Sequence, residues 1–445
     1  PRFSPLRERF GCTRARRDDV IRTRTDVGMD QMKQTRTGTT MKRRLLYSGI
    51  ISATLGAALL LGGGAAFAQS APDTIAASEE QPPEKEEVII ITGTRTQGRS
   101  VADSPVPVDV LSAGDIESVP FTDTNDILKS LVPSFAINRQ PISDGGTFTR
   151  PAELRGLPTD KTLVLVNSKR RHRAALVEIG GSGTQGPDIA TIPSSALKSV
   201  EVLRDGAAAQ YGSDAIAGVI NFILKDDTDG FSVTAQAGQY YEGDGAEYVV
   251  GANAGFALGA NGFINISGEY SKTDATIRAE QYCEAWFCLD PNNPDYDATA
   301  DYNAFLTPAY LAAVAKMGPV VQPWGQPNFE AARAFVNAGY TINDQAELYA
   351  FGNYSKSEGD GSFYYRYPLN GTIMNLRNAN GSIYSPLEKY PGGFTPRFFG
   401  EIVDYSAAGG IRGDLGGGFG YDISLRRGNN EIQYTLKNTI NPSLG

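Results

Sequence analysis

The chain has 445 residues, and its composition excludes several kinds of site before any motif is considered. His172 is the single histidine of the sequence, which excludes histidine-cluster metal sites and two-histidine haem ligation within it. Residues 1–68 hold 13 basic and 5 acidic side chains, a net charge of +8. Because the whole chain has a net charge of −9, the remaining residues carry −17. A basic leader on an acidic body argues against nucleic acid as a partner.

The N-terminal stretch reads as a secretion signal. Residues 1–40 precede Met41 and are predicted to be an upstream extension outside the mature protein. Within residues 41–68, basic residues at 42–44 lead into an apolar core at 45–61, and Ala66-Phe67-Ala68 is a small-x-small cleavage site. The alternative is a transmembrane helix, but small residues interrupt the apolar run and it is short for a span. We therefore predict an exported protein with a signal peptide at 41–68.

A tethered β-strand is expected next. Residues 69–86 are rich in Ala, Pro, Ser and Glu and should form a disordered linker. Residues 87–95 begin with the acidic residue Glu87. The β-branched run Val88-Ile89-Ile90-Ile91-Thr92 comes directly after it. Such a segment suits a strand that adds itself to the sheet edge of another protein, or simply the first strand of the next domain.

Residues 96–226 are predicted to form an α+β domain. An edge strand at 105–110 precedes a helix that starts near Ser112, and Asp123 caps a second helix that ends at Pro133. Strands are expected at 153–157 and 163–167. Leu197–Lys225 then reads as strand, turn, short helix, turn and strand, with Gly206 free to adopt a positive φ in the first turn.

Two local clusters in this domain invite binding interpretations. Lys169–Arg173 is a basic run, which either binds an anion or pairs with acidic groups nearby; we favour pairing because the mature chain is so acidic. Residues 180–186 are glycine-rich but lack the lysine and helix of a phosphate-binding loop.

From residue 231 onward, apolar and polar residues alternate with a period of two. Phe231, Val233, Ala235 and Ala237 share one face, and the pattern returns at 248–258, 419–426 and 432–437. In the last segment Ile432, Tyr434 and Leu436 are expected on the apolar face. A transmembrane barrel or a soluble sandwich gives this alternation. Tight turns at 258–262, 343–345 and 415–418, with long connections at 273–330 and 358–399, favour an antiparallel transmembrane β-barrel, of which residues 227–445 hold about eight strands.

The two long connections contain three candidate features. Cys283 and Cys288 are candidates for a disulfide in an oxidising compartment, with a two-thiol metal site as the weaker alternative. Four aspartates at 290, 295, 297 and 301 match no EF-hand spacing, so a solvated acidic loop is favoured and no metal site is predicted. Tyr364, Tyr365 and Tyr367 either contact an aryl or sugar ligand or pack the loop.

Several separated motifs resemble those of TonB-dependent outer-membrane receptors. Arg155-Gly156, Leu163–Asn167, Ile192-Pro193 and Leu197–Lys225 occur in the order of the family's plug domain, although Ser168 stands where the family usually has glycine. Glu87–Thr92 resembles the TonB box, with one apolar residue more than usual. The resemblance implies structural or gating roles in the plug for Arg155, Gly156, Asn167, Pro193, Glu201, Arg204, Asp205, Gly206, Tyr211, Gly212, Gly218 and Asn221.

The resemblance also implies a place and a function. Family barrels close with about 22 strands, so the chain is expected to be the N-terminal part of such a receptor, in the outer membrane of a Gram-negative bacterium. It would bind a scarce extracellular ligand, a ferric siderophore or other iron complex first, and import it through a TonB complex that engages Glu87, Val88, Ile89, Ile90, Ile91 and Thr92. An oligosaccharide or cobalamin-type importer and a non-energised surface-binding barrel are the alternatives.

No enzyme and no cofactor are expected, since no nucleophile, base or metal constellation is present. The expected partners are the TonB complex, the extracellular ligand and outer-membrane lipid. The charged turn formed by Glu201, Arg204 and Asp205 is expected to face a polar inner wall of the barrel.

Overall fold

The computed structural model describes residues 89–90, 92, 99–100, 107–119, 121, 123–137, 144–178, 183–204, 208–279, 307–317, 322–368 and 370–441, all within one compact unit spanning residues 52–445. The predicted signal peptide, the linker, Asp205, Gly206, Cys283 and Cys288 lie outside these residues. None of the helices in the described ranges has the length and apolar character needed to cross a membrane.

The N-terminal domain is built on a five-stranded mixed sheet in the order β3-β8-β9-β6-β7. Its strands are β3 (Val108–Ser112), β8 (Leu197–Leu203), β9 (Gly218–Leu224), β6 (Thr162–Val166) and β7 (Lys169–Arg170). β6 and β9 run parallel, while the other neighbours are antiparallel. The apolar runs of β6, β8 and β9 are almost wholly buried, so this sheet is the centre of the domain core. The predicted α+β class is confirmed.

Helices flank this sheet where the capping residues predict them. α1 (Ala113–Ser118) starts with a capping box, in which the Asp115 backbone N–H donates to Ser112 Oγ and the Ser112 backbone N–H donates to Asp115 Oδ2. Asp123 caps α2 (Thr124–Leu131), which buries Ile127 and Leu128. α3 is the short helix Ala208–Tyr211, and the two-stranded sheets β1 (Ile89–Ile90) with β2 (Arg99–Ser100) and β4 (Phe135–Ala136) with β5 (Glu153–Leu154) complete the described part of the domain.

The turn between β6 and β7 depends on a left-handed backbone. Asn167 and Ser168 have φ values of 45° and 63°. Ser168 therefore holds a conformation that glycine adopts most easily, which fits its place at a family glycine position. The strain is offset by hydrogen bonds, since the Ser168 backbone N–H donates to Asn221 Oδ1 at 3.0 Å and the Leu224 N–H donates to Asn167 Oδ1 at 2.9 Å.

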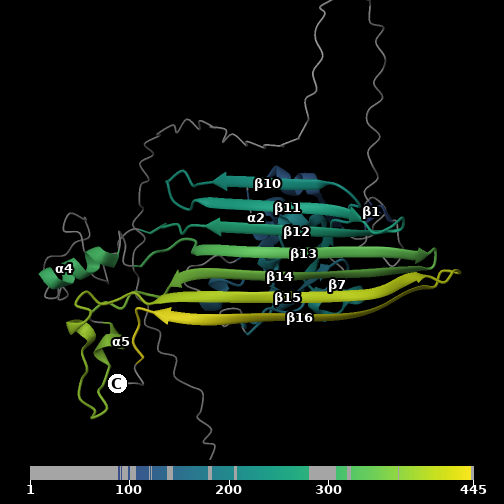
Figure 1. Ribbon diagram of the computed structural model, residues 1–445. Helices are drawn as coiled ribbons and strands as arrows, with labels where there is room; N and C mark the ends of the chain where they lie inside the picture. Colours follow the sequence, from purple (N-terminus) through teal and green to yellow (C-terminus); the bar gives the residue numbers. More distant parts are fainter. Residues whose placement is uncertain are drawn as a thin grey trace, which may run out of the picture. The chain divides into compact units, whose positions relative to one another are not determined.

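A second, larger sheet follows (Figure 1). Its strands pair antiparallel in chain order: β10 (Phe231–Gly238), β11 (Glu247–Ala257), β12 (Gly262–Thr273), β13 (Asn328–Asn343), β14 (Ala346–Ser362), β15 (Arg397–Asp414) and β16 (Gly420–Lys437). The described residues thus hold seven of the roughly eight strands expected. The connections after β11, β13 and β15 are tight, whereas those after β12 and β14 are long, as the sequence predicts. The long ones include α4 (Pro308–Val314) and α5 (Gly371–Met374).

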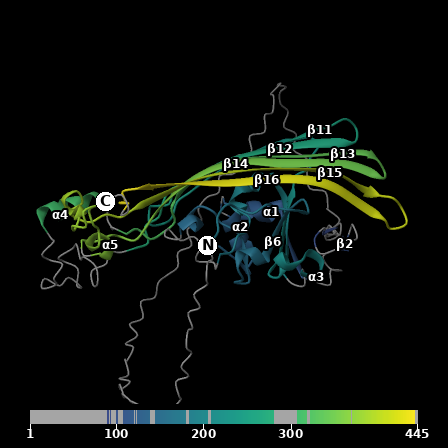
Figure 2. The same cartoon turned by 90° about the horizontal axis from the view of Figure 1, so that it is seen from below.

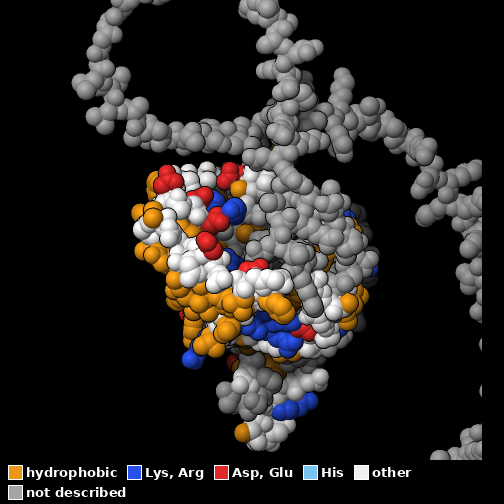
Figure 3. All heavy atoms as spheres, turned by 90° about the vertical axis from the view of Figure 1, so that its right-hand side faces the viewer, with side chains coloured by type: hydrophobic (Ala, Val, Ile, Leu, Met, Phe, Trp, Pro, Cys, Tyr) orange, Lys and Arg blue, Asp and Glu red, His pale blue; other side chains and the backbone are white. Residues whose placement is uncertain are grey.

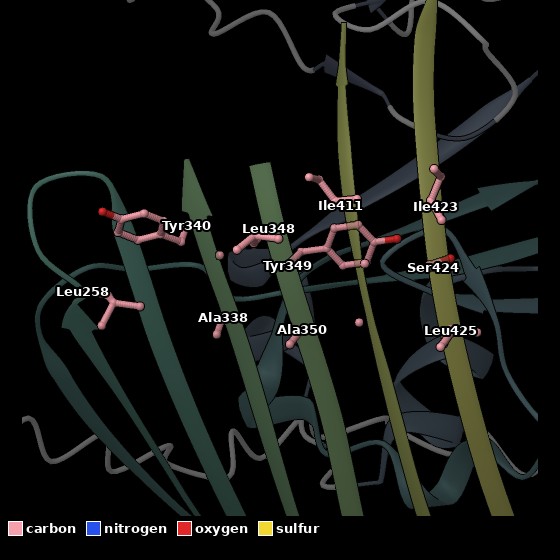
Figure 4. A pocket seen from close by; sticks show the side chains of 13 residues that line it. Leu258, Ala338, Tyr340, Leu348, Tyr349, Ala350, Ile411, Ile423, Ser424 and Leu425 are labelled. Carbon is pink, nitrogen blue, oxygen red and sulfur yellow. The ribbon is translucent and has the colours of Figure 1, made fainter. Parts of the chain in front are cut away.

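The two faces of the large sheet differ in chemistry. Its outer face exposes apolar and aromatic side chains, whereas its inner face buries polar ones, among them Asn253, Asn265, Ser267, Glu269, Arg333, Asn337, Asn353 and Asp404. Figure 3 views the tight-turn end and shows hydrophobic side chains gathered along the left flank. A shallow hollow of about 500 Å³ on the outer face is lined by Tyr340, Leu348, Ile411 and Leu425 (Figure 4).

Outward tyrosines mark two levels on this outer face. Tyr340 lies near the tight-turn end, and Tyr270, Tyr354 and Tyr405 lie on neighbouring strands nearer the long connections. Beyond the second level the outward side chains are charged, as in the pairs Lys272–Glu330 and Lys356–Glu401. Aromatic belts flanking an apolar band are typical of a transmembrane barrel wall, so the strands extend past the band on the loop side.

The length of β16 corrects the prediction of which face Ile432 and Tyr434 occupy. Ile432 and Tyr434 were expected on the apolar outer face, but they lie on the inner face, where Ile432 packs with Phe148, Phe398 and Ile402 and the Tyr434 ring stacks on Phe398 at 4.8 Å. β16 is one unbroken strand of 18 residues, so alternation continues from residue 420 and places Gln433 and Thr435 outward instead.

Candidate functional site

The N-terminal domain lies against the inner face of the large sheet (Figure 2). A buried charge network joins the two. Arg171 Nη2 lies 2.6 Å from Asp404 Oδ1 on β15, with only a few per cent of either side chain exposed. Arg171 also donates to Asn353 Oδ1 on β14 at 2.7 Å and to Ser406 Oγ at 2.8 Å. These bonds satisfy a buried guanidinium, which otherwise would be costly to desolvate.

His172 and Asp188 extend this network. His172 Nε2 lies 2.7 Å from Asp404 Oδ2, and its ring rests where a side chain at Gly428 of β16 would be. Asp188 accepts the backbone N–H of Ala190 at 3.0 Å. Burial raises the pKa of Asp188 to about 6, against the opposing effect of Arg150. The network therefore contains a carboxyl group that titrates in the mildly acidic range.

The rest of the basic run is paired as well. Lys169 Nζ lies 2.6 Å from Asp422 Oδ2 on β16, and Arg170 and Arg173 both pair with Asp214. The prediction that Lys169–Arg173 pairs with acidic groups is confirmed. Lys169 and Arg171 reach the large sheet, so this run fastens the domain to the sheet.

A second polar cluster holds the end of the predicted box. The Thr92 side chain is 1 % exposed, and its backbone N–H donates to Glu201 Oε2 at 2.7 Å. Asn221 Nδ2 donates to Thr92 Oγ1 at 2.9 Å and, at 3.4 Å, to Ser168 Oγ. The backbone of Ile89–Ile90 pairs antiparallel with Arg99–Ser100. The described residues of Glu87–Thr92 therefore lie against the chain's own N-terminal domain.

The same cluster continues to the large sheet. Asn167, next to Ser168 in the left-handed turn, donates from Nδ2 to Asn337 Oδ1 on β13 at 3.1 Å. Asn337 in turn donates to the Lys225 carbonyl at 2.9 Å. A chain of hydrogen bonds thus runs from Thr92 through Asn221 and the turn to β13.

The charged turn is not placed as expected. The Glu201 carboxylate is buried and accepts from Thr92, and Arg204 Nη2 lies 2.6 Å from Asp109 of β3, both within the N-terminal domain. Arg155 donates from Nη1 to the Arg204 carbonyl at 2.9 Å. These residues hold strand ends of the domain together, because β3 and β8 pair directly and leave Asp109 beside Arg204.

The remaining motif positions have local structural roles. Arg155 and Gly156 both have positive φ, as does Gly212, and Pro193 precedes a short 3-10 turn at Ser194–Ala196. A Cβ at Gly218 would lie 2.5 Å from the Leu203 carbonyl oxygen, so β8 and β9 need glycine there. Tyr211 packs against a small core cluster around Leu203 and Val219.

An aromatic anchor near the long connections was not predicted from the sequence. Phe148 is fully buried and packs at 5.1 Å between ring centroids on Phe398 of β15. It occupies the space left by Gly359 and Gly400, which are paired opposite each other on β14 and β15. Two inward-facing glycines at matched positions in adjacent strands are the signal that marks such a notch.

The outer connections are joined by tyrosines. Tyr310 of α4 is buried and its hydroxyl lies 3.4 Å from that of Tyr365, which also donates to the Gly392 carbonyl at 2.5 Å. Tyr365 is itself 1 % exposed, so its ring packs within the outer connections, and a ligand contact by these tyrosines stays a prediction. Tyr364 is nearly half exposed beside Trp324, and Tyr367 lies next to Tyr365. The described residues contain no group of three or more His, Cys, Asp or Glu side chains that could hold a metal ion.

Comparison with known families identifies the N-terminal domain. The sequence model of the TonB-dependent Receptor Plug Domain matches residues 100–219, which include β3, β6, β7 and β8 and the start of β9. The N-terminal domain belongs to the plug domains of TonB-dependent receptors. The N-terminal domain is accordingly the plug and the large sheet is part of the barrel wall. This match and the outer-membrane relatives place the protein in the outer membrane of a Gram-negative bacterium.

The curated relatives match part of the chain. The chain is 34 % identical over 137 residues to an iron-regulated outer membrane virulence protein of Vibrio cholerae, covering 31 % of the chain and 20 % of that protein. It is 28 % identical over 179 residues to the probable TonB-dependent siderophore receptor PirA of Acinetobacter baumannii, covering 38 % and 23 %. A ferric enterobactin receptor structure (PfeA) from Pseudomonas aeruginosa aligns with a TM-score of 0.42 at 16 % identity, over 74 % of this chain and 46 % of that one. The chain thus spans about a fifth of the curated relatives' length.

Proposed function

We propose that this receptor binds a ferric siderophore or another iron complex outside the cell and imports it into the periplasm. The observation that carries the proposal is the plug domain fastened inside a barrel wall, with the end of a box-like strand held against it at Thr92. Two relatives are named as an iron-regulated outer-membrane protein and as a siderophore receptor, which supports iron complexes over oligosaccharides or cobalamin-type ligands.

The proposed mechanism uses three parts of the chain. Ligand would bind at the outer connections and the adjoining plug surface, where the exposed Tyr364 and the half-buried Trp324 offer aromatic faces. Binding would shift the plug relative to the wall and free the segment Glu87–Thr92. The TonB complex of the inner membrane would then pair with that segment as an added strand and pull on the plug.

The experiment deletes Glu87–Thr92 in the full receptor chain and measures uptake of radiolabelled iron complexes by cells. We expect uptake to be lost while binding at the cell surface is retained, because the outer surface is untouched by the deletion. Uptake that survives the deletion would reject energised import and leave a passive or surface-binding role. A panel of catecholate, hydroxamate and carboxylate siderophores, with cobalamin and maltooligosaccharides as competitors, assigns the ligand class.

A further inference from the structure

A polar cluster surrounds Thr92. It lies at the junction of the predicted box, the plug core and the barrel wall. Thr92 is buried even though it belongs to a segment that must leave the plug under the proposed function. Its backbone N–H and its hydroxyl oxygen are both engaged by plug side chains, Glu201 and Asn221.

Asn221 is the central member of this cluster. Its side chain is fully buried on β9, and it contacts three groups: the Thr92 hydroxyl oxygen, the Ser168 backbone N–H and the Ser168 hydroxyl. A buried amide with this many partners has one orientation in which all are satisfied. A shift of the Ser168 turn therefore weakens the hold of Asn221 on Thr92.

The turn itself is tied to the barrel wall. Asn167 donates to Asn337 of β13, and Asn337 donates to the Lys225 carbonyl at the end of β9. Asn337 thus contacts both the Asn167–Ser168 turn and the residue that follows β9, the strand that carries Asn221. Movement between wall and plug at this point reaches Thr92 through two intervening side chains.

We propose that Thr92 is the fastening point of the box, and that Asn221, the Asn167–Ser168 turn and Asn337 are positioning residues that couple this fastening to the plug–wall contact. The inference rests on the proposed function and adds the residues that regulate it. While the plug stays seated on β13, these hydrogen bonds keep Thr92 engaged. When ligand shifts the plug, Asn221 loses its orientation and the strand is released for TonB.

Amide hydrogen exchange at Thr92 tests the fastening directly, because this N–H is one of the contacts. The full receptor chain without ligand is compared with Thr92→Val, which keeps size but removes the oxygen that accepts from Asn221, and with Thr92→Ser, which restores it. Loss of a buried hydrogen bond should speed exchange at residue 92 about tenfold in Thr92→Val, after correction for sequence effects, with Thr92→Ser near wild type.

The coupling is tested at the wall. Asn337→Ala should also speed exchange at Thr92 by several-fold, whereas the matched control Asn265→Ala should not. Asn265 is the register partner of Asn337 on β12 and is equally buried, but its hydrogen bonds in the described residues go to Asn253 of the wall. Equal effects of the two alanine variants would overturn the coupling.

A second readout separates fastening from general damage. The ligand-free receptor is titrated with the soluble periplasmic part of TonB, and Thr92→Val and Asn337→Ala should bind it at least threefold more tightly, with Thr92→Ser rescued. Wild-type exchange and wild-type TonB affinity in Thr92→Val would overturn the fastening while leaving import intact. If exchange changes as expected but deletion of Glu87–Thr92 leaves uptake intact, the proposed function fails and the contact stands alone.

Discussion

At the scale of single residues, the plug is held by buried charges whose cost depends on complete pairing. Arg171 and Asp404 are both nearly inaccessible to solvent. Arg171 also donates to Asn353 and Ser406, so most of the hydrogen-bond donors of its guanidinium have an acceptor. Removing one partner of such a pair leaves the other charge buried without compensation, whereas an exposed pair contributes little. The sequence contains the basic run, but the acidic partner lies 233 residues away, so only pairing in general could be predicted.

Arg171→Met should lower the free energy of unfolding of the receptor by about 3–5 kcal/mol, because the buried Asp404 carboxylate then loses its guanidinium partner. The matched control is Arg412→Met, which breaks the more exposed pair of Arg412 with Glu347 and should cost about 1 kcal/mol or less. Chemical denaturation of the full receptor in detergent measures both. Equal losses would show that the Arg171 pair has no special weight.

The raised pKa of Asp188 predicts that the free energy of unfolding depends on pH. Its pKa is raised by burial to about 6, above the value of an exposed aspartate, so the folded state binds its proton more tightly than the unfolded state. Asp188 therefore contributes to the free energy of unfolding at low pH. This contribution, about 3 kcal/mol in all, is lost as the pH rises from about 4 to about 6. Asp188→Asn should remove this part of the pH profile. Parallel profiles for the two proteins would contradict the assignment.

At the scale of elements, the alternation of apolar and polar residues predicted where the strands lie. It predicted poorly which face the side chains take at the ends of the strands near the long connections. Residues 247–257 follow the expected faces because one side of β11 is buried and the other is apolar and largely exposed. Tight turns were placed correctly because Gly and Asn mark them. Ile432 and Tyr434 were assigned outward because they are apolar, but the plug presents Phe148 on the inner side there. Apolar residues facing a packed plug cannot be distinguished from lipid-facing ones in the sequence.

The Phe148 notch gives the prediction at this scale. A methyl group at Gly400 would overlap the Phe148 ring, so Gly400→Ala should destabilise the plug–wall contact by about 1–3 kcal/mol. In a Phe148→Ala background the same substitution should cost much less, because the space is then free. Gly238→Ala on β10 is the control, since nothing lies within 4 Å of a Cβ there. Additive costs in the double variant would reject the notch.

At the scale of the whole molecule, the outer face of the barrel wall is organised by depth. Tyr340 marks one edge of an apolar band, and Tyr270, Tyr354 and Tyr405 mark the other, with outward charged pairs beyond them. β13 to β16 have 16 to 18 residues, whereas about 9–11 suffice to cross the hydrocarbon. The excess carries the strands into the outer connections, where α4 and the buried Tyr310–Tyr365 pair lie.

This depth order predicts how one strand responds to a charge. Val336 on β13 faces outward, 43 % exposed, between the two tyrosine levels, while Glu330 lies on the same strand beyond the band, where it pairs with Lys272. Val336→Arg should cost about 2–4 kcal/mol when the receptor folds into lipid vesicles, since an arginine near the bilayer midplane is poorly solvated. Glu330→Arg, in the wet outer part, should cost about 1 kcal/mol or less. Because both positions share a strand and a face, a cost at Val336 no larger than that at Glu330 would mean that the apolar band does not contact hydrocarbon.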